Sequence, residues 1–258
     1  MNRKIIALDL DGTLLNNDGK ISEISKKYLE KLKKEGHIVA IVTGRILKRA
    51  LFGTDGAEFA NYIVSDTGAA FFKKDNKEWK EIYSFTISKE LAKEILQYYG
   101  KDKFVSIDLC NKDGIYKYDG SVDMKKFLEN ISQITHITTG FLNNDFAIEY
   151  LQIFKSKFPS LEMGLMQDSF GNKRWIDIVQ KGVEKYKGIV EIAKLEKISN
   201  KDIVAFGDGL NDIEMLKKCG VGVAMKNALP EVKEKANYIT CKTNDENGVV
   251  EFLNDYLN

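Results

Sequence analysis

The first 45 residues consist of two short apolar runs separated by an amphipathic segment. Residues 4–10, KIIALDL, form a nearly continuous apolar run, which is typical of a strand buried on both faces. Apolar residues from Ile21 to Leu32 then recur at helical spacing, and Gly36 predicts the end of that helix through a left-handed cap. A second apolar run, HIVAIVTGR, occupies 37–45. A strand, a helix and a strand of these lengths predict a βαβ unit and a parallel sheet.

The last quarter of the chain repeats this alternation of helical and apolar segments. Gly220 predicts the end of one helix, and Asn227 lies near the predicted N-cap of the next, which has Pro230 in its first turn. The predicted helices cover 185–198, 211–220, 227–236 and 244–257, and the predicted strands cover 202–209, 221–225 and 237–240.

The middle of the chain has a different pattern. Short alternating segments, such as KFVSIDLC and RWIDIV, are separated by helical ones such as SKELAKEILQYYG, which predicts α+β structure with antiparallel strands. We interpret 83–181 as a smaller domain inserted into a core made of 1–82 and 182–258. The predicted fold class is α/β, with a doubly wound, mainly parallel, Rossmann-like sheet in the core.

Charge and cysteine usage narrow the possible partners and the compartment. The net charge of the 258 residues is +1, which gives no electrostatic reason to expect nucleic acid or an anionic membrane as a partner. Cys110, Cys219 and Cys241 are scattered, as in a reducing compartment. The apolar stretch after Lys4 is too short for a signal peptide, and no run reaches the roughly 20 residues of a membrane span. We expect a cytoplasmic protein, as a monomer or weak homodimer.

Polar residues that could carry chemistry occur at four places, three of them at the ends of predicted strands. These residues are Asp9 with Asp11, Thr43, Lys185, and Asp208 with Asn211 and Asp212. In an open parallel sheet, ligands bind at the carboxyl ends of the strands, so the fold should gather the four places in one crevice.

The residue types in this set point to phosphoryl transfer. The aspartates offer hard oxygen ligands with no cysteine or histidine close by, which favours Mg²⁺ over zinc. Thr43 and the backbone amides around Gly44 can bind an anion, and Lys185 adds a positive charge. Such a site suits a reaction in which catalysis depends mostly on positioning and charge neutralisation, and a carboxylate can also serve as the covalent acceptor.

The same stretches resemble the four motifs of the haloacid dehalogenase (HAD) superfamily, in the expected order. They are DLDGTLL, VTGR, the lysine of GVEKYKGI, and GDGLND. The closing stretches VGVAMKNALPEVKEKANYIT and NDENGVVEFL are similar to the Cof-type phosphatase branch, HAD-IIB. That branch carries an inserted C2-type cap between the second and third motifs, which implies that 83–181 is the cap. The similarity covers the core and is weak in the insertion.

The resemblance assigns a role to each matching residue. It implies that Asp9 is the nucleophile and that Asp11 is the general acid and then the general base. The phosphoryl group would be bound by Thr43, Gly44, Lys185 and Asn211. Mg²⁺ would be held by Asp9, Asp208 and the backbone carbonyl of Asp11, and Asp212 would orient the metal shell or the lysine.

The function so implied is Mg²⁺-dependent hydrolysis of small phosphorylated metabolites, such as sugar phosphates, through an aspartyl-phosphate intermediate. Two alternatives use the same carboxylates: a phosphomutase, and a non-catalytic receiver-like module whose aspartate is phosphorylated as a signal. Three residues depart from the pattern of the branch: Thr67 replaces asparagine, Asp177 replaces glutamate and Lys226 replaces glycine. We expect Thr67 and Asp177 to bear on substrate fit.

Overall fold

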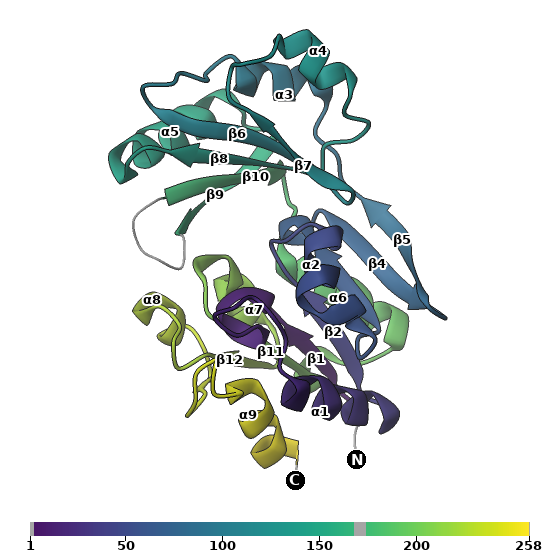
Figure 1. Cartoon of the computed structure of the whole chain (residues 1–258). Coiled ribbons are helices and arrows are strands. Elements are labelled where there is room, and N and C mark those ends of the chain that lie inside the picture. The colour runs from purple at the N-terminus through teal and green to yellow at the C-terminus, as the bar shows by residue number, and fades with distance from the viewer. Residues whose placement is uncertain (1–2, 168–173, 258) are drawn as a thin grey trace. The chain divides into compact units, whose positions relative to one another are not determined.

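A computed structural model describes residues 3–167 and 174–257 of the chain (Figure 1). The chain divides into two compact units, one made of Ser84–Val183 and the other of the segments on either side. Among the residues described, every helix is too short or too polar to cross a membrane. The flanking segments form the unit that we call the core, and Ser84–Val183 form the inserted unit.

The core is built on an eight-stranded sheet with the order β13-β12-β11-β1-β2-β3-β4-β5. Six neighbouring strands, from β13 to β3, run parallel, and β4 runs antiparallel to β3. This arrangement confirms the predicted doubly wound, mainly parallel α/β fold. The strands are β1 (Ile5–Leu8), β2 (Ile38–Val42), β3 (Tyr62–Ser65), β4 (Ala70–Asp75), β5 (Glu78–Ser84), β11 (Ile203–Gly207), β12 (Val221–Ala224) and β13 (Tyr238–Ile239).

Helices cover both faces of this sheet. Every residue of β1, β2, β3 and β11 is buried, as expected for strands covered on both sides. Helix α1 contacts α9, and α6 contacts α7, so the helices pair with one another as well as with the strands. The helices are α1 (Glu23–Lys34), α2 (Leu47–Gly53), α6 (Lys185–Glu196), α7 (Ile213–Lys218), α8 (Pro230–Lys233) and α9 (Gly248–Leu257).

The structure tests the predicted end of the first helix, at Gly36, and the predicted start of a later helix, near Asn227. Gly36 follows the end of α1 with φ of +94°, which confirms the predicted left-handed cap. The predicted N-cap near Asn227 is wrong, because Pro230 is the first residue of α8 and Leu229 therefore occupies the cap position. The Asn227 side chain instead donates to the carbonyl oxygen of Gly12, at 2.7 Å.

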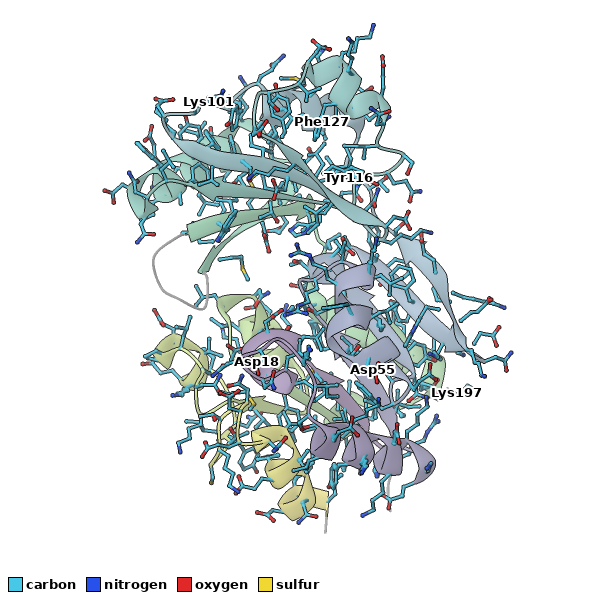
Figure 2. All side chains as sticks on the ribbon, viewed as in Figure 1. Asp18, Asp55, Lys101, Tyr116, Phe127 and Lys197 are labelled. Atoms are coloured by element: carbon cyan, nitrogen blue, oxygen red, sulfur yellow. The ribbon has the colours of Figure 1, made fainter. Side chains whose placement is uncertain are left out.

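The inserted unit has an antiparallel sheet with the order β7-β6-β8-β10-β9, and the antiparallel pairing was predicted. Buried aromatic side chains such as Phe104, Phe141 and Phe154 form its own core, against which Tyr116 and Phe127 pack. Figure 2 marks both of these residues, together with Lys101 and Lys197 at the surface of the two units. The elements are α3 (Lys89–Leu96), β6 (Phe104–Asn111), β7 (Gly114–Tyr118), α4 (Met124–Glu129), β8 (His136–Phe141), α5 (Asn144–Lys157), β9 (Leu161–Gln167) and β10 (Arg174–Gln180).

The register of the core sheet determines which residues meet at its carboxyl edge. Leu8, the last residue of β1, pairs with Ile41 of β2 and with Phe206 of β11. Asp9 is therefore level with the last residues of its two neighbours, and Thr43 and Asp208 follow one residue further on. Strand β1 lies between β2, its partner in the βαβ unit, and the C-terminal strand β11, which is the switch point where such sheets bind ligands.

Candidate active site

A buried lysine joins two of the predicted site residues. The Nζ atom of Lys185 donates to Asp9 Oδ1 and to Asp212 Oδ1, each at 2.7 Å. Lys185 is 2% exposed, Asp9 6% and Asp212 0%. A charge buried this deeply is tolerated only when it is paired and hydrogen-bonded, so these contacts hold together three segments that are distant in the sequence.

The environment shifts the pKa values of the charged groups in different directions. Burial and the neighbouring charge of Asp212 raise the pKa of Asp9 well above its usual value of 3.8, against the opposing effect of Lys185. Burial and Asp212 also raise the pKa of Asp208, to about 7. For Lys185, burial acts to lower the pKa, but Asp212 and Asp9 outweigh it and the pKa rises. For the carboxyl groups of Asp9 and Asp208, burial and Asp212 thus disfavour the ionised form more than Lys185 favours it.

Asp208 is held by the turn that follows β1. Leu10–Leu14 form a widened helical turn, closed by a hydrogen bond from the amide of Leu15 to the carbonyl of Leu10. Thr13 Oγ1 of this turn donates to Asp208 Oδ1 at 3.0 Å. Gly12 has φ of +69°, and a Cβ atom there would lie 2.2 Å from Asp208 Oδ2. Only glycine therefore allows the turn to approach the carboxylate this closely.

Asp212 is a positioning residue for the loop that carries Asp208. Its Oδ2 accepts hydrogen bonds from the backbone amides of Asp208 and Gly209, both at 3.0 Å, while its Oδ1 accepts from Lys185. Both oxygens are therefore engaged within the protein. The role that the family resemblance implies for Asp212, orienting the metal shell or the lysine, stays a prediction.

Of the predicted phosphate-binding residues, Thr43, Gly44 and Asn211 lie close together, whereas Lys185 contacts Asp9 and Asp212. A Cβ atom on Gly44 would be 3.8 Å from Asn211 Nδ2 and 3.6 Å from Thr67 Oγ1. Thr43, which directly follows β2, accepts a hydrogen bond from the amide of Arg45 through its hydroxyl, at 3.1 Å. Asn211 is adjacent in the sequence to Asp212, the partner of Lys185. A single turn therefore connects the residues around Gly44 with Lys185.

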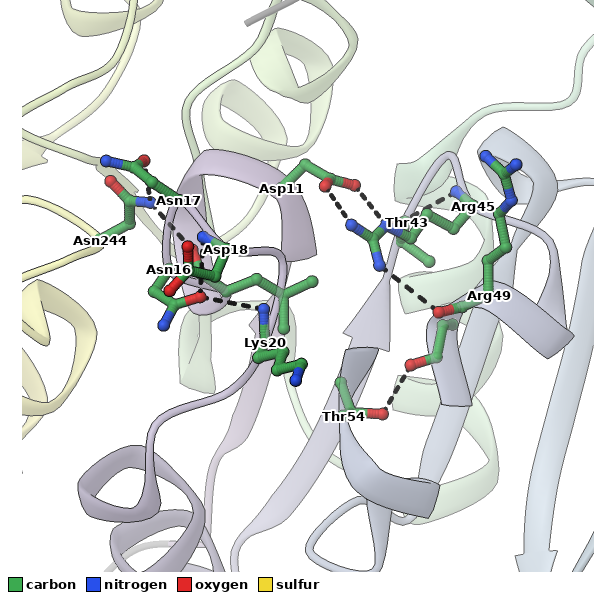
Figure 3. Close-up of polar contacts among 12 residues, drawn as sticks. Asp11, Asn16, Asn17, Asp18, Lys20, Thr43, Arg45, Arg49, Thr54 and Asn244 are labelled. Atoms are coloured by element: carbon green, nitrogen blue, oxygen red, sulfur yellow. Dashed lines mark hydrogen bonds and ion pairs between the residues drawn. The ribbon is translucent and has the colours of Figure 1, made fainter. Parts of the chain in front are cut away.

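The side chain of Asp11 is turned toward an arginine. Arg45 donates to both carboxylate oxygens of Asp11, from Nε at 2.7 Å and from Nη2 at 2.5 Å (Figure 3). Arg45 also donates to the carbonyl of Arg49, at 3.4 Å. Such a two-pronged pair fixes the orientation of a carboxylate more firmly than a single contact does.

Three carboxylates in the described part of the chain could together hold a metal ion: Asp9, Asp208 and Asp212 each offer an oxygen within 4.8 Å of the others. The donor set is made of oxygens alone, which fits Mg²⁺. Because both oxygens of Asp212 already accept hydrogen bonds, Asp9 and Asp208 are the better placed ligands. The raised pKa values of these two residues are consistent with a site built for a cation.

Thr13 and Arg45 contact the site residues directly, and the sequence analysis gave neither a role. Both lie inside stretches already singled out, DLDGTLL and VTGR. The signals that could have identified them are a small hydroxyl residue two and four positions after the strand-end aspartates, for Thr13, and a cation two positions after the strand-end Thr43, for Arg45.

The comparisons with known proteins agree with this geometry. Residues 6–253 match the model of the haloacid dehalogenase-like hydrolases. The chain therefore belongs to this family, as the resemblance of its motifs predicted, and phosphatases are among its relatives.

Individual relatives are similar over nearly the whole chain. A 5-amino-6-(5-phospho-D-ribitylamino)uracil phosphatase of Bacillus subtilis, YitU, is 30% identical over 98% of this chain and 97% of its own length. The stress response protein YhaX of the same organism is 28% identical over 100% of this chain and 94% of its own length. The subclass IIB sugar phosphatase BT4131 has the same fold, with a TM-score of 0.79, 23% identity and 98% of each chain covered.

The raised pKa of Asp208 predicts a pH-dependent effect of Mg²⁺ on stability. The folded value of about 7 lies above the ordinary 3.8, so this group stabilises the metal-free fold in acid, and its contribution is lost as the pH rises through about 7. Mg²⁺ binds the ionised carboxylate and opposes that loss. We expect Mg²⁺ to raise the melting temperature more at about pH 8 than at about pH 5.5.

Comparing samples with and without Mg²⁺ at each pH removes the effect of titrating groups that do not bind the ion, and Asp9, whose pKa is also raised, contributes in the same direction as Asp208. Asp208→Asn is the matched control, since it keeps the size of the side chain but should lose most of the gain from Mg²⁺. An equal gain at both pH values would contradict the assigned pKa.

Proposed function

We propose that the protein is a Mg²⁺-dependent phosphatase that hydrolyses small phosphorylated metabolites through an aspartyl-phosphate on Asp9. The observation that carries this proposal is the buried pairing of Lys185 with both Asp9 and Asp212 at the end of β1, beside Asp208. This pairing holds a carboxylate nucleophile in place and neutralises part of the charge around it. Phosphatases among the relatives support the same reaction class.

In the first step, a carboxylate oxygen of Asp9 attacks phosphorus and the phosphorus–oxygen bond of the ester breaks. Asp11 enters this step carrying a proton on an oxygen that Arg45 no longer holds, and gives that proton to the departing oxygen, which leaves as an alcohol. Thr43, Asn211 and the amides near Gly44 bind the phosphoryl oxygens. Lys185 offsets the negative charge around the reacting carboxylate.

In the second step, Asp11 accepts a proton from a water molecule whose oxygen attacks the phosphorus of the aspartyl-phosphate. The bond between phosphorus and the Asp9 oxygen breaks, inorganic phosphate leaves, and Asp9 is again a carboxylate. Mg²⁺, held by Asp9, Asp208 and the backbone carbonyl of Asp11, would supply positive charge that neutralises the phosphoryl group.

The substrate class follows from the relatives and from the insertion. YitU is named for a phosphorylated ribityl compound, and BT4131 is described as a sugar phosphatase. We infer a phosphate monoester of a sugar or a similar polyhydroxylated metabolite, in the cytoplasm. Residues 83–181 would act as a cap that recognises the leaving group and excludes water during the reaction.

The direct test of the proposed function is Asp9→Asn. This change removes the nucleophile and scarcely alters the side-chain volume, so we expect phosphate release to fall by about 10³-fold or more in a folded protein. Release of inorganic phosphate is measured against a panel of sugar phosphates, with a melting curve as the control for folding.

The same assay separates the alternatives. Near wild-type release by Asp9→Asn would exclude the aspartyl-phosphate route. A wild-type protein that moves phosphate within the substrate, without releasing it, would be a phosphomutase. One that stays phosphorylated and turns over no phosphate ester would be a receiver-like module.

The pairing of Asp11 with Arg45 predicts a dependence on the leaving group. Arg45→Met removes the group that orients the Asp11 carboxylate, so proton donation should suffer. An alkyl phosphate needs that proton, whereas p-nitrophenyl phosphate has a good leaving group and does not. We expect the loss of kcat/KM to be at least about 10-fold greater for the alkyl ester.

Asp11→Asn should show the same preference and serves as the reference for a missing proton donor. Arg45→Lys keeps the charge without the two-pronged contact and should fall between wild type and Arg45→Met. Equal losses on both esters would mean that Arg45 supports only the structure of the site. Faster turnover of the alkyl ester would mean that Arg45 restrains Asp11.

A further inference from the structure

The loop after β3 has an unusual backbone and lies against the predicted phosphate-binding loop. Asp66, Thr67 and Gly68 follow one another with φ of +52°, +58° and +106°. A β-branched residue such as threonine rarely adopts this left-handed conformation. Backbone strain of this kind is retained mainly where a functional site requires it.

Two backbone hydrogen bonds keep the loop in place. The amide of Thr67 donates to the carbonyl of Thr43 at 3.1 Å, and the amide of Asp66 donates to the carbonyl of Arg45 at 3.0 Å. The loop therefore runs beside the whole VTGR stretch. Gly68 also lets the start of α6 come close, because a Cβ atom there would lie 2.6 Å from the carbonyl oxygen of Glu184, next to Lys185.

The Thr67 hydroxyl is a buried polar group without a hydrogen-bond partner in the part of the chain that the structure describes. Buried hydroxyls almost always have such a partner, so this one calls for an explanation. Its Oγ1 lies 3.6 Å from the position of a Cβ on Gly44, and Asn211 Nδ2 lies 3.8 Å from the same point. A hydroxyl and an amide thus converge on a glycine that has no side chain between them.

We propose that the Thr67 hydroxyl binds the phosphoryl group of the substrate by donating a hydrogen bond to one of its oxygens, next to Gly44 and Asn211. This assignment rests on the proposed function. A phosphoryl oxygen is an acceptor, and a hydroxyl donates to it with no charge of its own to bury. The backbone contacts with Thr43 and Arg45 hold the donor in position before the ligand arrives.

The test compares Thr67→Val with Thr67→Ser. Valine has the same branched shape, so the backbone strain is kept and only the hydroxyl is lost, whereas serine keeps the hydroxyl. Binding of inorganic phosphate in the presence of Mg²⁺ is measured by calorimetry, and KM is measured for p-nitrophenyl phosphate and a sugar phosphate. For Thr67→Val we expect about a 10-fold or greater weakening in all three measurements, and for Thr67→Ser a change within about 3-fold.

Unchanged phosphate binding by Thr67→Val would overturn the proposal. A loss confined to the sugar phosphate would overturn it too, because the hydroxyl would then contact the leaving group. If Thr67→Val fails to fold, Thr67→Gly, which removes the hydroxyl and the strain together, must show the same weakening. A wild-type protein that binds inorganic phosphate but releases none from esters would refute the proposed function and leave the Thr67 comparison valid.

Discussion

The candidate site depends on one buried ammonium group. Lys185 lies between Asp9 and Asp212, and these contacts join the end of β1, the start of α6 and the turn before α7. When Asp9, Asp208 and Asp212 are all ionised, one lysine leaves an excess of negative charge, and burial together with the charge of Asp212 raises the pKa values of Asp9 and Asp208. Burial makes that excess costly, so the site is poised to bind a cation and, beside it, a ligand with which the cation can interact. The fold thus sets the charge balance from which the proposed chemistry follows.

Close backbone approach is the second requirement of this site. Gly12 allows the turn after β1 to touch Asp208, and Gly68 allows the loop after β3 to touch the start of α6. Gly44 leaves the space between Thr67 and Asn211 without a side chain. A Cβ atom would collide with the Asp208 carboxylate at Gly12 and with the backbone of Glu184 at Gly68, and at Gly44 it would contact Thr67 and Asn211. Polar groups that follow four strands can therefore approach one another closely at this edge of the sheet.

The sequence predicted which strand ends form the site better than it predicted the contacts of the individual side chains. Apolar runs identify β1, β2 and β11, and the polar residues at their ends must meet because parallel strands end at one edge. The orientation of Asp11 could not be predicted, since its partner Arg45 lies 34 residues away and rotamers depend on the assembled turn. The orphaned hydroxyl of Thr67 depends on a strained loop that has no periodic pattern. Asn227 was misassigned because a helix-capping residue and a residue that binds a distant carbonyl look alike in sequence.

The central claim is that Asp9 becomes covalently phosphorylated, and chemical trapping tests it most directly. Borohydride reduces an aspartyl-phosphate to homoserine, so the reagent is added while the enzyme turns over its best sugar phosphate with Mg²⁺, and the peptides are analysed by mass spectrometry. The account predicts homoserine at position 9 and nowhere else, and none when substrate or Mg²⁺ is omitted. Homoserine at position 11 or 208, or its absence from an actively hydrolysing enzyme, would contradict the account.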